Sequence, residues 1–213
     1  MPSIKFWYFP GACSIAPHIV LKELGVPFEP IRMQLENGAV PESFRTINSK
    51  MKVPVLSIDG QIITEIPAIM TALSQLAPER KVLGGTDMDV VRSYEWMNWL
   101  SGSLHGQGYG PFFRSDRYSE DESMHTAIRE KALKTILGYY DIIEDKLSGK
   151  HAVGDSFSVV DTYLYVFWRW GATQLDMAAK YPKYAKLVNE LLGNSAVQGA
   201  LKAEEVESYA PKL

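Results

Sequence analysis

Residues 4–25, IKFWYFPGACSIAPHIVLKELG, contain two hydrophobic patterns separated by a turn. The first six residues are mostly β-branched and aromatic, which is typical of a largely buried strand. Pro10 and Gly11 end this run. From Ser14 the apolar side chains recur at helical spacing as far as Gly25, a residue type that often ends a helix. The stretch therefore predicts a strand, a tight turn and a helix.

The segments that follow extend this unit. A second short strand is predicted around residues 28–33. In VPVLSIDGQIITE, residues 53–65, two apolar runs are joined by Asp59 and Gly60, which is a strong hairpin signal. The apolar pattern after residue 65 then predicts a helix that ends before Pro78. This order of strands and helices matches a small α/β fold of the thioredoxin type.

The second half of the chain follows a different pattern. Residues 78–89, PERKVLGGTDMD, are charged and contain two glycines without an amphipathic period, which is typical of a linker. Between residues 123 and 147 apolar side chains recur every three or four residues, and no strand signal follows. We therefore predict an α/β plus all-α protein, with a thioredoxin-like domain at 1–79, a linker at 80–87 and a helical-bundle domain at 88–213.

The composition argues against several classes of protein. The chain has 22 Lys+Arg and 25 Asp+Glu with no long run of either sign, so a nucleic-acid partner is not expected. No apolar stretch is long enough to span a membrane and no signal-peptide pattern is present, so we expect a cytoplasmic protein without a membrane partner. One cysteine cannot form an internal disulfide, and the scattered histidines show no metal-ligand spacing, so no metal is predicted.

Cys13 lies just before the predicted helix, and its position allows two interpretations. Unpaired N–H groups and the helix dipole stabilise an anion there, so the pKa of the thiol is expected to be lowered. Ser14 then caps the helix or donates its hydroxyl to a neighbouring sulfur. In the other interpretation Cys13 is inert and buried, since free cysteine is among the most buried residue types. Position alone favours neither.

Val53-Pro54 and Glu65 are candidates for binding an extended peptide. A cis bond at Val53-Pro54 would turn the backbone N–H and C=O of Val53 outward, toward such a ligand. A trans bond would instead make Pro54 an ordinary strand start. Glu65 lies where the N–H groups of the next helix attract an anion, although a carboxylate there more often compensates the helix dipole.

A histidine and several aromatic residues are further candidates in the helical half. His105 lies on a predicted helix that runs into Gly106, Gly108 and Gly110. The aromatic residues around it either line an apolar pocket or pack in the core: Trp99, Tyr109, Phe112, Phe113 and Trp170. The segment from Ser158 to Asp161 matches a capping box, and the aromatic residues after it are expected to pack in the core.

Together these segments resemble the cytosolic glutathione transferases, and most closely the bacterial beta class. PGACSIAPHIVLKELG, residues 10–25, is similar to the class signature in which a cysteine faces the glutathione sulfur. NSKMKVPVL, residues 48–56, resembles the segment that contains its cis-proline, and residues 56–69 resemble its hairpin and helix start. SFSVVDTYLYV, residues 156–166, resembles the family's buried capping motif. The segments occur in family order across nearly the whole chain.

The resemblance implies a role for individual residues. Val53 pairs through its backbone with the cysteinyl part of glutathione, and Glu65 with Ile66 holds the γ-glutamyl end. Cys13 and His105 flank the sulfur. The other predicted glutathione contacts are Ser14, Pro54, Asn98 and Ser103, and the predicted electrophile pocket consists of Tyr8, Tyr109, Phe112, Phe113 and Trp170. The family usually has serine at the position of Ile66, which here leaves only a backbone N–H for the glutamyl carboxylate.

The resemblance also implies the activity. Glutathione is the expected co-substrate, a homodimer the expected assembly, and detoxifying conjugation of small apolar electrophiles the expected reaction, with thiol–disulfide exchange through Cys13 as a second activity. One alternative is another glutathione-dependent enzyme, such as a disulfide or peroxide reductase or a dehalogenase. The other alternative is a non-catalytic binding protein with weakened glutathione affinity, which Ile66 favours.

Overall fold

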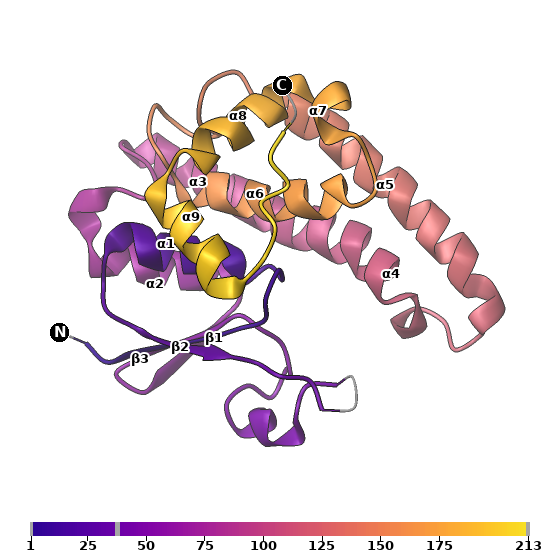
Figure 1. Ribbon diagram of the computed structural model, residues 1–213, viewed down its shortest axis with the longest axis horizontal. Helices are drawn as coiled ribbons and strands as arrows, with labels where there is room; N and C mark the ends of the chain where they lie inside the picture. The colour runs from indigo at the N-terminus through magenta and orange to yellow at the C-terminus, as the bar shows by residue number, and fades with distance from the viewer. Residues whose placement is uncertain (1, 37–38, 212–213) are drawn as a thin grey trace.

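The computed structural model describes residues 2–36 and 39–211, in which a four-stranded sheet is followed by helices (Figure 1). The strand order is β2-β1-β3-β4. Strand β1 (Ile4–Tyr8) pairs parallel with β2 (Glu29–Arg32) and antiparallel with β3 (Val55–Ile58), and β3 pairs antiparallel with β4 (Gln61–Thr64). The mixed sheet of the predicted thioredoxin-like fold is thereby confirmed.

The Asp59-Gly60 hairpin is confirmed as well. The two residues join β3 to β4 with φ angles of 50° and 82°, the left-handed geometry that a two-residue hairpin turn requires. Helix α2 (Ile66–Leu76) follows β4 after a single residue, Glu65. The turn therefore sets where α2 begins, and with it the position of Glu65.

Helix α1 (Ile15–Leu24) is buried on every side. It ends at Gly25, whose φ of 66° allows the left-handed cap that the sequence predicted. Seven consecutive residues from Ile15 to Leu21 are buried, because the helix lies between the sheet and helices α6 and α9 (Figure 1). On the sheet side, the rings of Phe6 and Tyr8 contact the ring of His18.

The second half of the chain is helical, as predicted, and contains no strand within the ranges that the structure describes. The main helices are α3 (Asp87–Trp99), α4 (Gly110–Phe113), α5 (His125–Lys146), α6 (Val159–Ala172), α7 (Met177–Lys180), α8 (Pro182–Leu192) and α9 (Ser195–Glu204). Single 3₁₀ turns occupy Glu42–Thr46, Pro78–Arg80, Ser115–Arg117 and Glu122–Met124. None of the described helices combines the length and hydropathy that a bilayer-spanning segment needs.

The segment between α3 and α4 differs from the sequence expectation. The helix does not end at the glycines: Leu100–Tyr109 continues it as a π-helix, which α4 then extends. A π-helix closes its hydrogen bonds over five residues instead of four, so residues four or five apart share a face. Gly108 fits because a Cβ there would lie 2.9 Å from the side chain of Ile136 on α5. The widened turn therefore alters which side chains of this segment point the same way.

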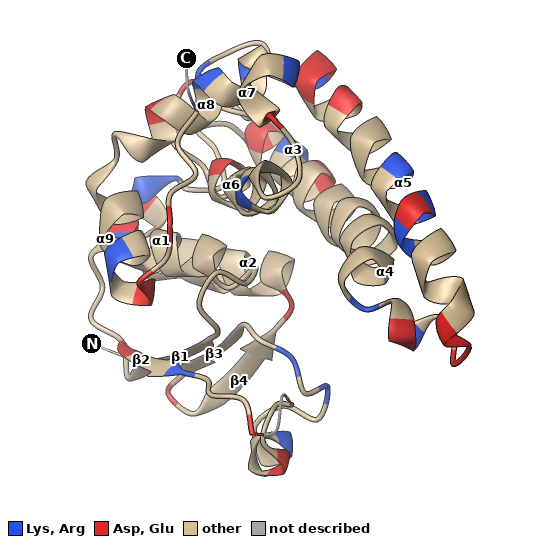
Figure 2. Ribbon diagram, turned by 45° about the vertical axis from the view of Figure 1, so that its right-hand side comes forward, with Lys and Arg blue, Asp and Glu red and all other residues tan. Residues whose placement is uncertain are grey.

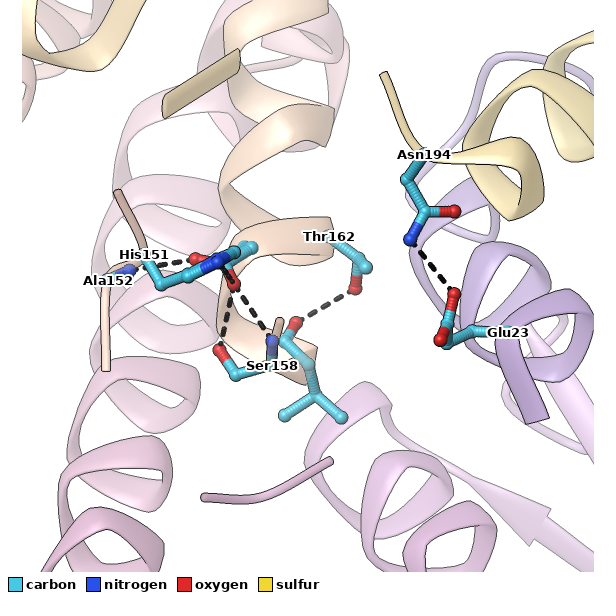
Figure 3. A network of polar contacts seen from close by, with 8 residues as sticks. Glu23, His151, Ala152, Ser158, Thr162 and Asn194 are labelled. Atoms are coloured by element: carbon cyan, nitrogen blue, oxygen red, sulfur yellow. Dashed lines mark hydrogen bonds and ion pairs between the residues drawn. The ribbon is translucent and has the colours of Figure 1, made fainter. Parts of the chain in front are cut away.

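Helix α6 forms the centre of the helical half, and its start is fixed by the predicted capping box (Figure 3). The Asp161 carboxylate is fully buried and accepts hydrogen bonds from the backbone N–H groups of Ser158 and Ala152, each at 2.8 Å. It also contacts Nδ1 of His151 at 3.0 Å, and this hydrogen bond raises the pKa of His151. The carboxylate thus ties the loop before α6 to the helix.

Replacing Asp161 by alanine is expected to destabilise the protein strongly, because it leaves buried N–H groups without an acceptor. We expect the free energy of unfolding, measured by urea denaturation, to fall by roughly 3–5 kcal/mol. Asp121→Ala is the control, since its carboxylate caps only an exposed 3₁₀ turn through Ser123 and should matter far less. Equal losses in the two variants would contradict this role for Asp161.

The same contact predicts a pH dependence. A raised pKa in the folded state means that protonated His151 stabilises the fold fully below about pH 6.5, and that this contribution is lost as the pH rises through the folded-state pKa. His151→Gln should therefore cost more stability at about pH 5.5 than at about pH 8.5. A cost that is the same at both pH values would show that His151 acts through its shape and not through its charge.

Candidate functional site

A cavity of about 640 Å³ is lined by residues from both halves of the chain. The N-terminal half contributes the turn before α1, the loop before β3 and the start of α2, while the helical half contributes the π-helical segment, the end of α4 and α6. Predicted site residues that line it are Cys13, Val53, Pro54, Glu65, Ile66, His105, Tyr109 and Phe113. The tertiary structure therefore gathers most of the predicted residues at one place.

Cys13 lines this cavity as a buried, neutral thiol. The side chain is only 7% exposed, and burial raises the pKa of Cys13 to about 12. The expected lowering of the pKa is therefore wrong for this structure, because loss of hydration outweighs the field of α1, which begins two residues later at Ile15. The nearest acceptor of the thiol is the carbonyl oxygen of Val53, 3.8 Å from Sγ.

Ser14 takes neither of its two expected roles. Its hydroxyl makes no side-chain cap to α1. Instead it donates to the carbonyl of Phe9 at 3.1 Å and accepts from the N–H of Phe9 at 3.2 Å. Ser14 is fully buried and outside the cavity lining, so it holds the turn that carries Cys13 closed.

The Val53-Pro54 bond is cis, the alternative that the sequence left open. Val53 and Pro54 line the cavity immediately before β3 begins at Val55. Lys50 and Lys52 precede them and line the cavity too, which gives this wall positive charge. Figure 2 shows basic positions, coloured blue, on the loop beside β4.

Glu65 occupies a backbone conformation that is unusual for a residue with a side chain. Its φ is 73°, and Met51, also in the cavity lining, has a φ of 54°. Such strain is found mainly at functional sites, where the surrounding structure maintains it. The Glu65 carboxylate pairs with the ammonium of Lys50. Glu65 therefore offers a carboxylate at the mouth of the cavity, at the start of α2.

Ile66 is the first residue of α2 and is 4% exposed, with its side chain in the hydrophobic core. Pro67 follows and has no N–H group, so few donors face the cavity at this helix start. The side chain of Ile66 supplies none. An anion at the start of α2 would therefore find backbone N–H groups but no donor from the side chain of Ile66.

His105 lies on the π-helical segment and faces the cavity. Its ring packs against Trp170 and Phe167, with centroid separations of 5.2 and 6.1 Å. Burial lowers the pKa of His105 to about 4, and the charge of Lys52 lowers it further. The imidazole is therefore neutral near pH 7 and offers one donor and one acceptor nitrogen.

Only some of the residues predicted for the electrophile pocket line the cavity. Tyr109 and Phe113 line it, whereas Phe112 and Trp170 pack behind them. Trp170 instead donates its indole N–H to the carbonyl of Gly11 at 3.1 Å. Tyr8 lies outside the lining altogether, because its ring stacks on Phe6 and faces His18 in the core.

Asn98 and Ser103 also lie outside the cavity lining, and Ser101 takes their place. Asn98 and His105 are seven residues apart and would share a face of an α-helix. The π-helix has more residues per turn, so the two side chains no longer point the same way. Ser101 and His105, four residues apart, face the cavity together. The sequence contains no signal for this widening beyond the unusual number of glycines.

Several cavity residues were not predicted from the sequence. They are Lys50, Lys52, Ser101, Arg114, Arg117, Tyr118 and Tyr163. The aromatic run that includes Tyr163 was expected to pack in the core, and most of it does. Among the described residues no cluster of three or more histidine, cysteine, aspartate or glutamate side chains is arranged to hold a metal ion.

Comparison with known proteins supports the resemblance found in the sequence. Two family models match, the glutathione S-transferase N-terminal domain over residues 2–74 and the glutathione S-transferase C-terminal domain over residues 114–194. Glutathione S-transferase GstA of Escherichia coli O157:H7 is 32% identical over 210 residues, which covers 94% of this chain and 98% of that protein.

Two solved structures share the fold over nearly their full length. The glutathione transferase homologue of Sulfitobacter with bound glutathione has a TM-score of 0.88 and 25% identity, covering 97% of this chain and 100% of that one. The bacterial beta-class glutathione S-transferase of Sphingomonas chungbukensis has a TM-score of 0.82 and 30% identity, covering 95% of this chain and 100% of that one. The chain therefore belongs to the glutathione S-transferase family and resembles its bacterial beta class.

Proposed function

We propose that this glutathione transferase joins the sulfur of glutathione to small electrophiles in the cavity described above. The observation that supports this most is that Cys13, Val53, Glu65 and His105, which come from four separate segments, line one cavity. Glutathione lies extended along Val53, with its sulfur toward Cys13 and His105 and its γ-glutamyl ammonium at Glu65. The electrophile lies against Tyr109 and Phe113.

The glutathione thiolate is the nucleophile in this mechanism. Its sulfur attacks the electrophilic carbon, a C–S bond forms, and the leaving group departs with its bonding electrons while the thiol proton passes to solvent. His105, kept neutral by burial, accepts a hydrogen bond from the thiol or donates one to the sulfur. The charge of Lys52 lowers the pKa of Cys13 and of His105, and it favours a thiolate at the same place.

Cys13 is a neutral neighbour of that sulfur and not the attacking group. Thiol–disulfide exchange would need its thiolate to attack a disulfide such as oxidised glutathione, releasing one glutathione thiolate. Because burial raises the pKa of Cys13 to about 12, that thiolate is scarce near pH 7. Conjugation is therefore favoured over exchange as the main activity.

A homodimer is part of the proposal. Large apolar side chains are exposed on β4, α3 and α5 of the single chain: Ile62, Met88, Val91 and Ile142, which are 40–59% exposed. Patches of exposed apolar side chains mark protein–protein interfaces in many proteins. We expect these elements to form the contact between two copies.

Glutathione titration by calorimetry tests the proposed function, and substitutions at Ile66 test how the glutamyl carboxylate is bound. The wild type should bind glutathione at millimolar concentration or below. Ile66→Ser adds a hydroxyl donor for the glutamyl carboxylate, so the dissociation constant should fall about tenfold. Ile66→Ala is the matched control, because it removes the same apolar bulk without adding a donor.

The outcomes separate the alternatives. Heat that stays at the baseline at millimolar glutathione would favour the non-catalytic binding protein. Equal binding by the serine and alanine variants would show that another group already holds the carboxylate.

Alkylation of Cys13 tests its protonation state, and the chain has one cysteine, so labelling is specific. Iodoacetamide reacts with the thiolate; with a pKa of about 12, folded Cys13 should react at least tenfold more slowly than free cysteine near pH 7. The rate should still rise with pH above about pH 9, where free cysteine levels off. Urea-unfolded protein is the control and should react like free cysteine. A plateau at mildly acidic pH would instead indicate a stabilised thiolate.

A further inference from the structure

Tyr163 is a buried residue of α6 whose hydroxyl the mechanism above does not use. Four buried side-chain polar atoms have no hydrogen-bond partner within the described part of the chain: His18 Nε2, Ser115 Oγ and the hydroxyls of Tyr163 and Tyr181. Of these four residues, Tyr163 alone belongs to the cavity lining. Leaving a buried hydroxyl without a partner is unfavourable, so a ligand that accepts a hydrogen bond from it recovers that free energy.

Three other buried tyrosines of the helical half are hydrogen-bonded, and Tyr181, which has no partner among the described residues, lies outside the cavity lining. Tyr140 donates to the carbonyl of Phe167, Tyr165 to that of Ser208 and Tyr184 to that of Leu164. The ring of Tyr163 is fixed by Phe167, with centroids 5.1 Å apart, and the residue is fully buried. Its hydroxyl is therefore held in one position.

The hydroxyl of Tyr163 lies in the part of the molecule where the glutathione sulfur is proposed to bind. Tyr163 and Cys13 both line the cavity. Burial raises the pKa of Tyr163 far above its ordinary value, and a negative charge at the position of Cys13 would raise it further, so the two groups lie within electrostatic reach of each other. The nearby hydroxyl of Ser101 partly offsets this rise in the pKa of Tyr163. The hydroxyls of Ser101 and Tyr163 nevertheless do not meet hydrogen-bond geometry. A phenol that keeps its proton is a hydrogen-bond donor and not a base.

We propose that Tyr163 is a further catalytic residue, whose hydroxyl donates a hydrogen bond to the sulfur of bound glutathione and stabilises the thiolate. The proposal rests on the proposed glutathione transferase function. The phenol keeps its own proton throughout, and the thiol proton leaves to solvent. Cys13, His105 and Tyr163 then surround the sulfur from the α1 turn, the π-helical segment and α6.

Tyr163→Phe tests this role, because it removes only the oxygen. One hydrogen bond to a charged group is worth about 1.5–3 kcal/mol, so we expect kcat to fall at least about tenfold. The pKa of bound glutathione, read from the ultraviolet absorbance of its thiolate and from the pH profile of kcat/KM, should rise by about one unit. Stability in urea should not fall, since the lost hydroxyl had no partner.

Tyr181→Phe is the matched control. Its hydroxyl is also buried without a hydrogen-bond partner in the described ranges, but it lies outside the cavity lining. It should leave the pKa of bound glutathione unchanged. If Tyr163→Phe binds and ionises glutathione as the wild type does, the role of Tyr163 is excluded while the transferase function stands. If the wild type itself does not bind glutathione, the proposed function fails first.

A separate observation concerns the charge of the cavity. Its lining holds four basic side chains, Lys50, Lys52, Arg114 and Arg117, and one acidic side chain, Glu65, although the whole chain has a net charge of -3. Lys50 pairs with Glu65. Neither Arg114 nor Arg117 has a carboxylate within 4.0 Å among the described residues, whereas Arg32, Arg45, Arg80 and Arg92 each have one.

The two arginines follow α4 in the helical half, where Phe113 and Tyr118 also line the cavity. Lys50 and Lys52 instead belong to the N-terminal half and precede Val53. Lys50 and Lys52 belong to the same segment as Val53, along which glutathione is proposed to lie. The arginines therefore offer charge to the second substrate, beside an aromatic surface.

We infer that the preferred electrophiles have a planar apolar body and a carboxylate, with Arg114 and Arg117 binding the carboxylate. This inference also rests on the proposed function. Guanidinium groups suit carboxylates because they offer paired N–H donors in one plane.

Paired probes test this preference: 2-chloro-1,3-dinitrobenzene, which is neutral, and 4-chloro-3,5-dinitrobenzoate, which adds a carboxylate para to the chlorine. In both, the glutathione sulfur displaces chloride from the ring. The double variant Arg114→Ala with Arg117→Ala should lose about tenfold or more in kcat/KM with the benzoate and at most about twofold with the neutral probe. Added salt should reduce only the benzoate rate.

Arg129→Ala on α5 is the control, since Arg129 also has no ion pair in the described residues but does not line the cavity. It should change neither rate. Equal losses with both probes in the double variant would show that the arginines support the cavity without selecting its ligand. No turnover of either probe by the wild type would count against the proposed function instead.

Discussion

The turn that presents Cys13 depends on a carboxylate from the far end of the chain. Glu204, the last residue of α9, is fully buried and contacts Nδ1 of His18 at 2.8 Å and the N–H of Gly11 at 3.0 Å. The carbonyl of Gly11 in turn accepts from the indole of Trp170 at 3.1 Å. An unpaired buried charge is costly. The Glu204 carboxylate and the Gly11 carbonyl therefore find their partners only when α9, α1 and α6 meet at the turn.

This arrangement explains why the cavity lies between the halves of the chain. The sheet and α1 place Cys13, Val53 and Glu65 on one wall, and α6 brings Tyr163 and the aromatic layer to the other. Gly11 has a φ of 73°, so the turn needs a residue that tolerates the left-handed region. The same contacts therefore fix the fold and the site.

Burial governs the chemistry of the site more than the helix dipoles do. It raises the pKa of Cys13, lowers that of His105 and raises that of Tyr163, so all three groups are neutral near pH 7. Neutral donors and a nearby lysine suit a site that receives its negative charge from the ligand. The strained backbone at Glu65 and the π-helical segment mark the two places where local geometry departs from regular structure around that ligand.

Much of this protein was determined by the sequence alone. Local patterns predicted β1, α1, the Asp59-Gly60 hairpin and the cap of α6, because the turn geometry and helix ends depend on residues close in the chain. The order of motifs also predicted the family and a part of the cavity lining in the N-terminal half, namely Cys13, Val53, Pro54, Glu65 and Ile66. Only the tertiary structure decided the pKa of Cys13, the presence of Ser101 in the cavity lining in place of Ser103, and the presence of Tyr163 in that lining. The pKa of Cys13 depends on how deeply the thiol is buried. The lining residues depend on which way each side chain points on a helix that packs against distant segments. Neighbouring residues in the sequence determine neither property.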